Sequence, residues 1–277
     1  MGLVEAIHPS LGTIDYRQPM VKLVFIGGSF LFLSTVFLVG AQGSKWLKPY
    51  QNLPLRNKVI WNRRCVRAIF GLFGTVVGSW VIWWDEVANE TTPTGFVAVY
   101  VALGYFLFDT LVLLSIELMT EKNDILQIGH HCLALLLMSF AAYYECLQYF
   151  VVSGLFLEMV MPFDTLCYIL AKCGRAKSMI WKVGQAAHIH TYHLRSAVEC
   201  FTWVQIYRHW NHVWKNTPLP LLFTYLFCLS MVTFVMTPYW GYKETDRLFK
   251  SIHNYPIPNQ EQENRVQNGD VIHEKDM

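Results

Sequence analysis

Seven long apolar stretches constrain this chain more than any other feature of its sequence. They cover residues 20–41, 66–84, 96–118, 128–146, 149–171, 183–206 and 218–240. Each is close to the roughly 20 residues that a helix needs to cross a bilayer. Because lipid offers no hydrogen-bond partners, each stretch must satisfy its own backbone polar groups, which a helix does. The sequence therefore predicts an all-α, polytopic membrane helix bundle with about seven transmembrane helices.

The composition agrees with a membrane protein and argues against other classes. Hydrophobic residues make up 53% of the 277 residues and charged residues only 15%, whereas soluble domains carry about 25% charge. The formal net charge is +2, and the chain has no basic stripe suited to nucleic acid. The seven cysteines include no CxxC pair, so we expect packed free thiols.

The distribution of basic residues predicts the orientation. The segments after the first and fifth stretches are rich in Lys and Arg, whereas the segment after the second stretch has neither. By the positive-inside rule the N-terminus is lumenal and the C-terminus cytosolic. Tryptophans near the stretch ends predict a lumenal belt of Trp83, Trp84, Trp210 and Trp214 and a cytosolic belt of Trp46, Trp61 and Trp181. Asn89, in an Asn-Glu-Thr sequence, is then a lumenal candidate for glycosylation.

These features divide the chain into four parts. We predict a lumenal N-terminus (1–19), a first helix with a basic cytosolic loop (20–59), the main transmembrane domain (60–242) and a cytosolic tail (243–277). The tail has little to bury, so we expect it to be disordered.

Ionisable residues inside the apolar stretches are the candidate functional residues, because each is costly in lipid. Those that we single out are Asp109, His130, His131, Glu158, Asp164, His190, His193 and Arg195. At about 1.5 Å of rise per residue, they share the cytosolic half of the bilayer. Groups on different helices at similar depth can pair, so we predict a central cavity at or near the cytosolic side. Adjacent residues of a helix point about 100° apart, so one of the two adjacent histidines is expected to face this cavity.

Two arrangements of the intramembrane charges remain open at this stage. Arg195 can pair with Glu199 one turn further along the same helix, or it can reach Glu158 or Asp109 on neighbouring helices. Both readings neutralise the arginine, and sequence does not separate them.

The segment HIHTYH and the proline of the fifth stretch have simpler readings. His190 and His193 share a helix face, but a metal site needs more ligands that converge in space, so we predict no metal. Pro162 is expected to kink its helix, because proline lacks the backbone N–H and clashes with the preceding turn.

Several motifs together resemble one family. GYFLFDTLVLL, then GHHCLALLL, then LFLEMVMPFDTLCYIL and then HLRSAVECF are similar to segments of the TLC-domain family, over roughly residues 60–245. This family includes ceramide synthases and the translocating-chain-associated membrane protein. The resemblance implies a helix bundle around a lipid-sized cavity, usually in the endoplasmic reticulum membrane. It also implies that His130 and His131 match the histidine pair of acyl transfer, with Asp109 orienting or charge-balancing a histidine.

One departure separates the chain from ceramide synthases. They carry His, Asp and Asp where this chain has Phe150, Val151 and Gly154, although Glu158 remains. The sequence therefore resembles the non-synthase members, for which a role in membrane lipid composition is implied.

Three functions follow as hypotheses. The first is a protein that binds a lipid or acyl chain in its cavity and regulates lipid composition, with membrane lipids as partners and no bound cofactor. The alternative is an N-acyltransferase of the ceramide synthase type, which uses the histidine pair and takes acyl-CoA as substrate. The third is a structural or trafficking role. The oligomeric state is left open.

Overall fold

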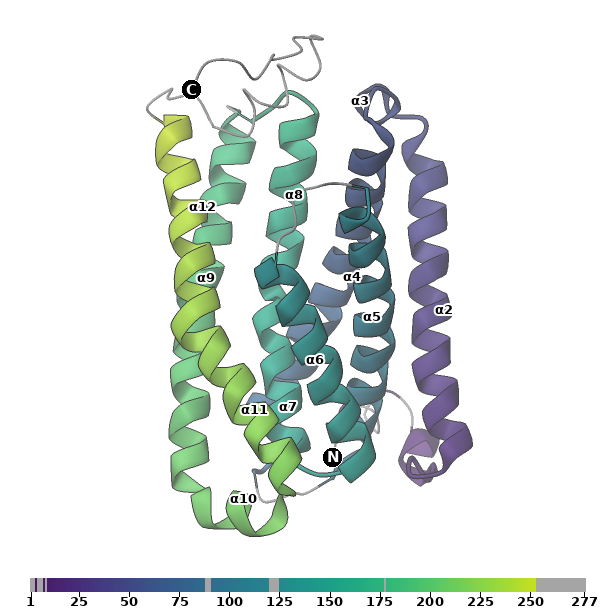
Figure 1. Ribbon diagram of the computed structural model, residues 1–277, viewed down its shortest axis with the longest axis vertical. Helices are drawn as coiled ribbons and strands as arrows, with labels where there is room; N and C mark the ends of the chain where they lie inside the picture. The colour runs from purple at the N-terminus through teal and green to yellow at the C-terminus, as the bar shows by residue number, and fades with distance from the viewer. Residues whose placement is uncertain are drawn as a thin grey trace.

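The structure is a computed structural model that describes residues 9–87, 91–119, 125–176 and 178–252, with the single residues 3 and 7. Within this part of the chain all regular elements are helices, as predicted. The long helices lie side by side in one bundle (Figure 1). The elements are η1 (Pro9–Thr13), α2 (Pro19–Ser44), α3 (Lys48–Gln51), α4 (Leu55–Trp84), α5 (Pro93–Glu117), α6 (Ile125–Tyr144), α7 (Gln148–Ser153), η2 (Gly154–Met159), α8 (Val160–Lys172), α9 (Met179–Arg208), α10 (Trp210–Asn216), α11 (Leu219–Met231), η3 (Val232–Met236) and α12 (Thr237–Ile252).

The described chain passes along the bundle seven times. Five passes are the single helices α2, α4, α5, α6 and α9, and two are interrupted helices, α7–η2–α8 and α11–η3–α12. Among the described residues, six passes are long and apolar enough to cross a membrane, all but α9. At 30 residues, α9 is as long as α4, and it packs against α8 and α12. The start of α2 and the end of α12 lie at opposite ends of the bundle (Figure 1), as an odd number of passes requires. The chain is thus a polytopic integral membrane protein.

The second pass is longer than its apolar stretch. α4 begins at Leu55, not near residue 66, so part of the predicted basic loop is helix. An apolar stretch ends where charges begin, whereas the helical backbone continues back to Leu55, directly after the extended Pro54. Arg63 and Arg64 therefore lie within the bundle and form ion pairs there.

The last helix extends into the predicted tail. α12 continues to Ile252, and Gln185 of α9 holds it by donating from Nε2 to Oε2 of Glu244 at 2.8 Å. The first part of the segment predicted to be disordered is therefore helical. Residues 253–277 lie outside the described residues, as does Asn89.

Three glycines of α4 bring the fifth pass unusually close. A Cβ atom at Gly71, Gly74 or Gly78 would lie only 2.5–2.7 Å from backbone atoms of η2. Small residues of this kind let membrane helices approach each other. The fifth pass departs from α-helix over η2, just before Pro162, because the proline ring disfavours the α-helical position of the carbonyl four residues earlier.

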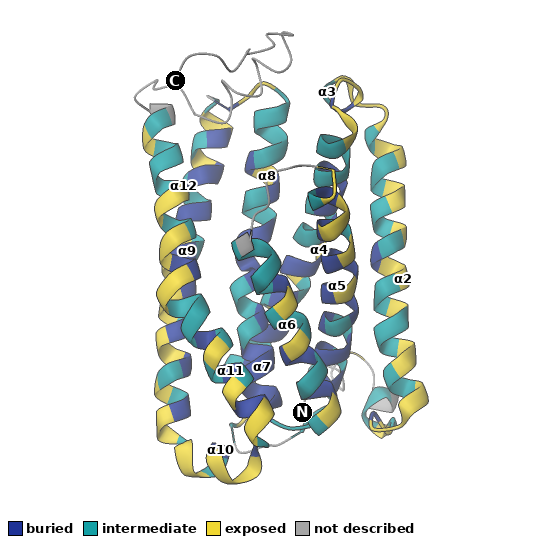
Figure 2. Ribbon diagram, viewed as in Figure 1, coloured by how far each residue is buried: buried dark blue, intermediate teal, exposed yellow. Residues whose placement is uncertain are grey.

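The first pass packs along α5 and α4. A Cβ atom at Gly104 of α5 would lie 2.0 Å from Oγ of Ser29 in α2, so these helices pack tightly. Near the start of α2, Lys22 forms an ion pair with Glu145 at the end of α6. Figure 2 shows exposed and intermediate residues along α2, whereas buried residues concentrate on α4, α5, α7 and α9.

Two tryptophans of the predicted belts lie in the interior instead. Trp61 and Trp181 are each 2% exposed. Their indole N–H groups donate to Oγ of Ser44 and to the carbonyl oxygen of Cys167, both at 3.1 Å. Trp46 is 88% exposed and remains a candidate interfacial anchor.

Candidate functional site

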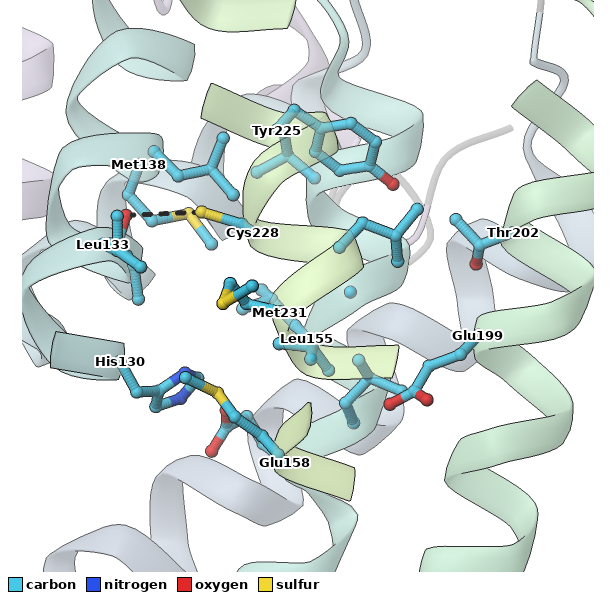
Figure 3. A pocket seen from close by; sticks show the side chains of 18 of the residues that line it. His130, Leu133, Met138, Leu155, Glu158, Glu199, Thr202, Tyr225, Cys228 and Met231 are labelled. Atoms are coloured by element: carbon cyan, nitrogen blue, oxygen red, sulfur yellow. Dashed lines mark hydrogen bonds between the residues drawn. The ribbon is translucent and has the colours of Figure 1, made fainter. Parts of the chain in front are cut away.

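A cavity of about 100 Å³ lies where α6, α7, η2, α9, α11 and η3 meet (Figure 3). Its wall is mostly apolar and includes Leu133, Ala134, Leu137, Met138, Val151, Leu155, Val198, Leu229 and Val232. One water-sized group needs about 10–15 Å³ on this measure. The cavity can therefore hold a row of several methylene-sized groups.

The histidine and the carboxylates of the cavity gather toward one end. His130 lies near the start of α6 and Met138 eight residues later, and both line the wall. Glu158 lies at the level of His130, whereas Tyr225 lies toward Met138 (Figure 3). Eight residues of helix correspond to about 12 Å. The cavity is thus an apolar slot of about this length with a polar end, and that end faces the same way as the α8–α9 connection.

Arg195 is held within its own helix and by α12. Its Nε donates to Oε1 of Glu199 at 3.1 Å and to Oγ1 of Thr237 at 2.8 Å. The Thr237 hydroxyl in turn donates to Oε1 of Glu199 at 2.6 Å. The guanidinium carbon lies 6.0 Å from the ring centre of Trp240. Of the two arrangements left open by the sequence, the structure has the pairing of Arg195 with Glu199.

His130 and Glu158 are the groups at the polar end that are left for a ligand. Glu158 is 6% exposed, and no hydrogen bond joins its carboxyl group to another described residue. The His130 ring also lacks a hydrogen bond within the described chain and packs edge-on against Trp240, with ring centres 5.9 Å apart. Figure 3 shows both side chains at the same end of the cavity. They can accept or donate hydrogen bonds to a polar head bound there.

His131 and Asp109 lie behind the cavity wall. The prediction that all the candidate residues line one central cavity is therefore wrong for these two. Asp109 is fully buried and accepts two hydrogen bonds from Arg63, each at 2.7 Å. His131 Nε2 lies 3.3 Å from both Asp109 Oδ2 and Arg63 Nη2. The ring of Phe106, which lines the cavity, packs against the His131 ring. Asp109 therefore fixes His131, and neither of them lines the cavity.

The remaining predicted residues lie elsewhere. Asp164 forms an ion pair with Arg64 and does not line the cavity. His190 and His193 are exposed on the outer face of α9, so the prediction that they line the cavity is wrong. The two residues lie about one turn apart, and their ring centres are 5.6 Å from each other. In the part of the chain that the structure describes, no group of three His, Cys, Asp or Glu residues could hold a metal ion.

Three residues of this site were not among the predicted ones. The sequence analysis places Arg63 and Arg64 in a basic loop. Nothing between Pro54 and Arg63 breaks a helix, and this continuity is the signal that could have found them. Thr237 has no signal in the sequence, because its role depends on how α12 packs on α9.

Comparisons with known proteins show which family the chain matches. The family model of the TLC domain matches residues 60–244. Protein CLN8 of Homo sapiens is 28% identical over 280 residues, which cover 96% of each chain. Protein CLN8 of Rattus norvegicus is 29% identical over 255 residues, covering 90% of this chain and 88% of the relative.

A more distant relative is TLC domain-containing protein 4-B of Danio rerio, 29% identical over 155 residues, with 54% of this chain and 57% of the relative covered. No solved structure matches the chain significantly. Since the family model covers most of the transmembrane bundle, this chain belongs to the TLC-domain family.

Proposed function

We propose that this protein binds an acyl chain of a membrane lipid in the cavity and thereby regulates membrane lipid composition. The observation that carries the proposal is the apolar slot with His130 and Glu158 at one end. A lipid tail would occupy the apolar part, and its ester, amide or hydroxyl group would lie against these two side chains. Pockets with an apolar wall and a few convergent polar groups are the usual form of a small-molecule site.

We propose the endoplasmic reticulum membrane as the location, with the N-terminus lumenal and the C-terminus cytosolic. The connections α2–α4 and α8–α9, which carry the basic residues, lie at the same end of the bundle as the end of α12 (Figure 1). Clustering of Lys and Arg at one end supports a cytosolic assignment for that end. The polar end of the cavity would then face the cytosolic leaflet.

The wall of the cavity favours binding over catalysis. Val151 and Gly154 line it at two positions where ceramide synthases, which this chain resembles, carry aspartates. Phe150, at the position of the synthase histidine, is 2% exposed and packs against Tyr225. From this segment only Glu158 brings an acid to the cavity.

A cavity-filling substitution tests the binding proposal. Gly154 lines the cavity, and a Cβ atom there would meet nothing within 4 Å. Gly154→Leu should therefore fill the slot without a backbone clash and should favour helix, because glycine is a poor helix former. The matched control is Gly28→Leu in α2, where a Cβ atom also meets nothing within 4 Å but which lies far from the cavity.

Lipids that co-purify with each variant are measured by mass spectrometry, alongside the lipid classes of cells lacking the protein and re-expressing each variant. We expect Gly154→Leu to lose the co-purified lipid and fail to restore lipid composition, while Gly28→Leu behaves as wild type. Unchanged lipid classes in cells without the protein would contradict the regulatory role. Equal lipid retention by both variants would contradict this cavity as the binding site.

An acyltransferase is the second candidate, and the cavity position of His130 favours it. In such a reaction His130 would accept the proton of an attacking amine while the nitrogen bonds to the thioester carbonyl of acyl-CoA and the CoA thiolate leaves. His131 would act as a positioning residue, since Asp109 and Arg63 fix its ring.

Labelled acyl-CoA with a panel of amine acceptors distinguishes this second function. His130→Gln should abolish the product while keeping the thermal midpoint of unfolding, because no hydrogen bond within the described chain is lost. The acyltransferase reading fails if product formation survives this substitution, or if no acceptor of the panel yields product.

A further inference from the structure

A second and larger opening lies at the basic end of the bundle, away from the cavity. It is a groove of about 500 Å³ between α2, α3 and the start of α4. Most of it is formed by residues that precede the TLC-domain match at residue 60. We call it the α2–α4 groove, and its wall includes Phe37, Ala41, Lys45, Lys58, Val59 and Asn62.

The charge of the groove is positive and uncompensated. Lys45 and Lys58 line it, and neither forms an ion pair with a described residue. The sequence contains no Asp or Glu between Asp15 and Asp85. The ammonium group of Lys58 lies 5.8 Å from the ring centre of Tyr50, which keeps it at the groove. An anion placed between the two lysines would meet no acidic neighbour from this part of the chain.

The groove changes from charged to apolar along its length. On α2, Lys45, Ala41 and Phe37 are spaced by four residues, so they share one face and descend from the helix end toward the membrane interior. α4 runs in the opposite direction. On this helix Lys58 therefore lies near the outer end, and Asn62 lies one turn further toward the membrane interior. The two lysines therefore lie at the outer end, and the apolar side chains lie below them.

Asn62 supplies a second, independent observation. Its side chain is 4% exposed, and Nδ2 donates to Tyr50 Oη at 3.0 Å. Its Oδ1 atom has no hydrogen-bond partner in the described chain. A buried polar atom without a partner is costly, and a polar group or water carried with a ligand would satisfy it.

We propose that the α2–α4 groove binds an anionic phospholipid, with the phosphate between Lys45 and Lys58 and an acyl chain along Phe37 and Ala41. Basic pockets between membrane helices are suited to such head groups. A soluble phosphate compound would leave the apolar wall unused, so the lipid is the occupant that fits both ends. The site is separate from the cavity and does not depend on the proposed function.

Native mass spectrometry of the purified full-length protein tests the proposal. The protein is titrated with phosphatidylinositol and with phosphatidylcholine of the same acyl chains, and the bound fraction is measured. We expect the wild type to prefer phosphatidylinositol. Lys45→Gln/Lys58→Gln should weaken that binding by about 25-fold, because each basic residue near an anionic lipid contributes about fivefold.

The matched control is Lys48→Gln/Lys182→Gln, which removes the same charge at the same end of the bundle from positions outside the groove. Control binding should stay within about twofold of wild type, and both double variants should keep the wild-type thermal midpoint. The proposal is overturned if the wild type binds both lipids equally, or if the control loses as much binding as the groove variant. It is also overturned if inositol phosphate without acyl chains competes as well as the lipid. Gly154→Leu should leave this binding unchanged, which separates the groove from the cavity.

Discussion

The buried ion pair between Arg63 and Asp109 gives the sharpest stability prediction. Both oxygens of the Asp109 carboxylate accept hydrogen bonds from Arg63 at 2.7 Å, and the two side chains are 0% and 6% exposed. Among the described residues, Asp109→Leu would leave the Arg63 guanidinium in the interior with only His131 Nε2 beside it. Breaking a buried pair by removing one partner costs about 3–5 kcal/mol.

The double variant Arg63→Met/Asp109→Leu should recover most of that loss. Replacing both members of a buried pair by apolar residues of similar volume is often neutral, because both desolvation costs disappear. A matched control exists in the exposed pair of Lys250 and Asp246, whose side chains are 35% and 40% exposed. Asp246→Leu should cost about 0–1 kcal/mol.

Thermal melting of the detergent-purified variants, followed by size-exclusion chromatography, measures the effect. For chains of this size 1 kcal/mol corresponds to roughly 2–4 °C in the midpoint. Asp109→Leu should therefore lower the midpoint by roughly 6–20 °C, using 3–5 kcal/mol for the lost partner. The reasoning is refuted if Asp109→Leu melts within the range of the exposed control, or if the double variant is no more stable than the single one.

Three further substitutions test other parts of the structure by the same melting assay. Thr237→Val removes the hydroxyl that bridges Arg195 and Glu199 and should lower the free energy of unfolding by about 1–3 kcal/mol. A melting midpoint equal to wild type would contradict that bridge. Gly78→Ala places a methyl group 2.5 Å from the backbone nitrogen of Phe156 and should cost about 1–3 kcal/mol by overpacking, whereas a neutral result would show that the two segments separate freely. His131→Ala should lower the midpoint more than substitution of His130 does, because only His131 contacts a buried ion pair; the reverse order would contradict the assignment of the two rings.

The sequence predicted the bundle well because hydropathy depends on local composition. Seven stretches of sufficient length correspond to the seven passes, and the polar sixth stretch is the pass whose composition falls short. The Arg195–Glu199 pair could be anticipated, because the two residues are one turn apart on a single helix. Such features need no knowledge of how helices pack.

The arrangement of polar groups could not be predicted in full, since it depends on helix rotation. The depth predicted for each residue along its helix correctly indicates that Asp109 and His131 can meet. Depth does not tell, however, which side of a helix faces the cavity. His190 and His193 share the depth of their neighbours and still point outward. Arg63 could not be predicted as the partner of Asp109, because the charged first turns of a helix have the same composition as a basic loop.

The direct backbone contact between α4 and η2 has a consequence for the proposed lipid site. Where the glycines of α4 touch the backbone of η2, the η2 side of the slot has no room to move back when one of its side chains, such as Leu155, is enlarged. If relatives bind lipids that differ in tail length or unsaturation, the differences should therefore map to α6 and α11, which form other walls of the slot. Substitutions at Met138, Leu229 or Met231 are the places where a changed lipid preference should arise without loss of the bundle.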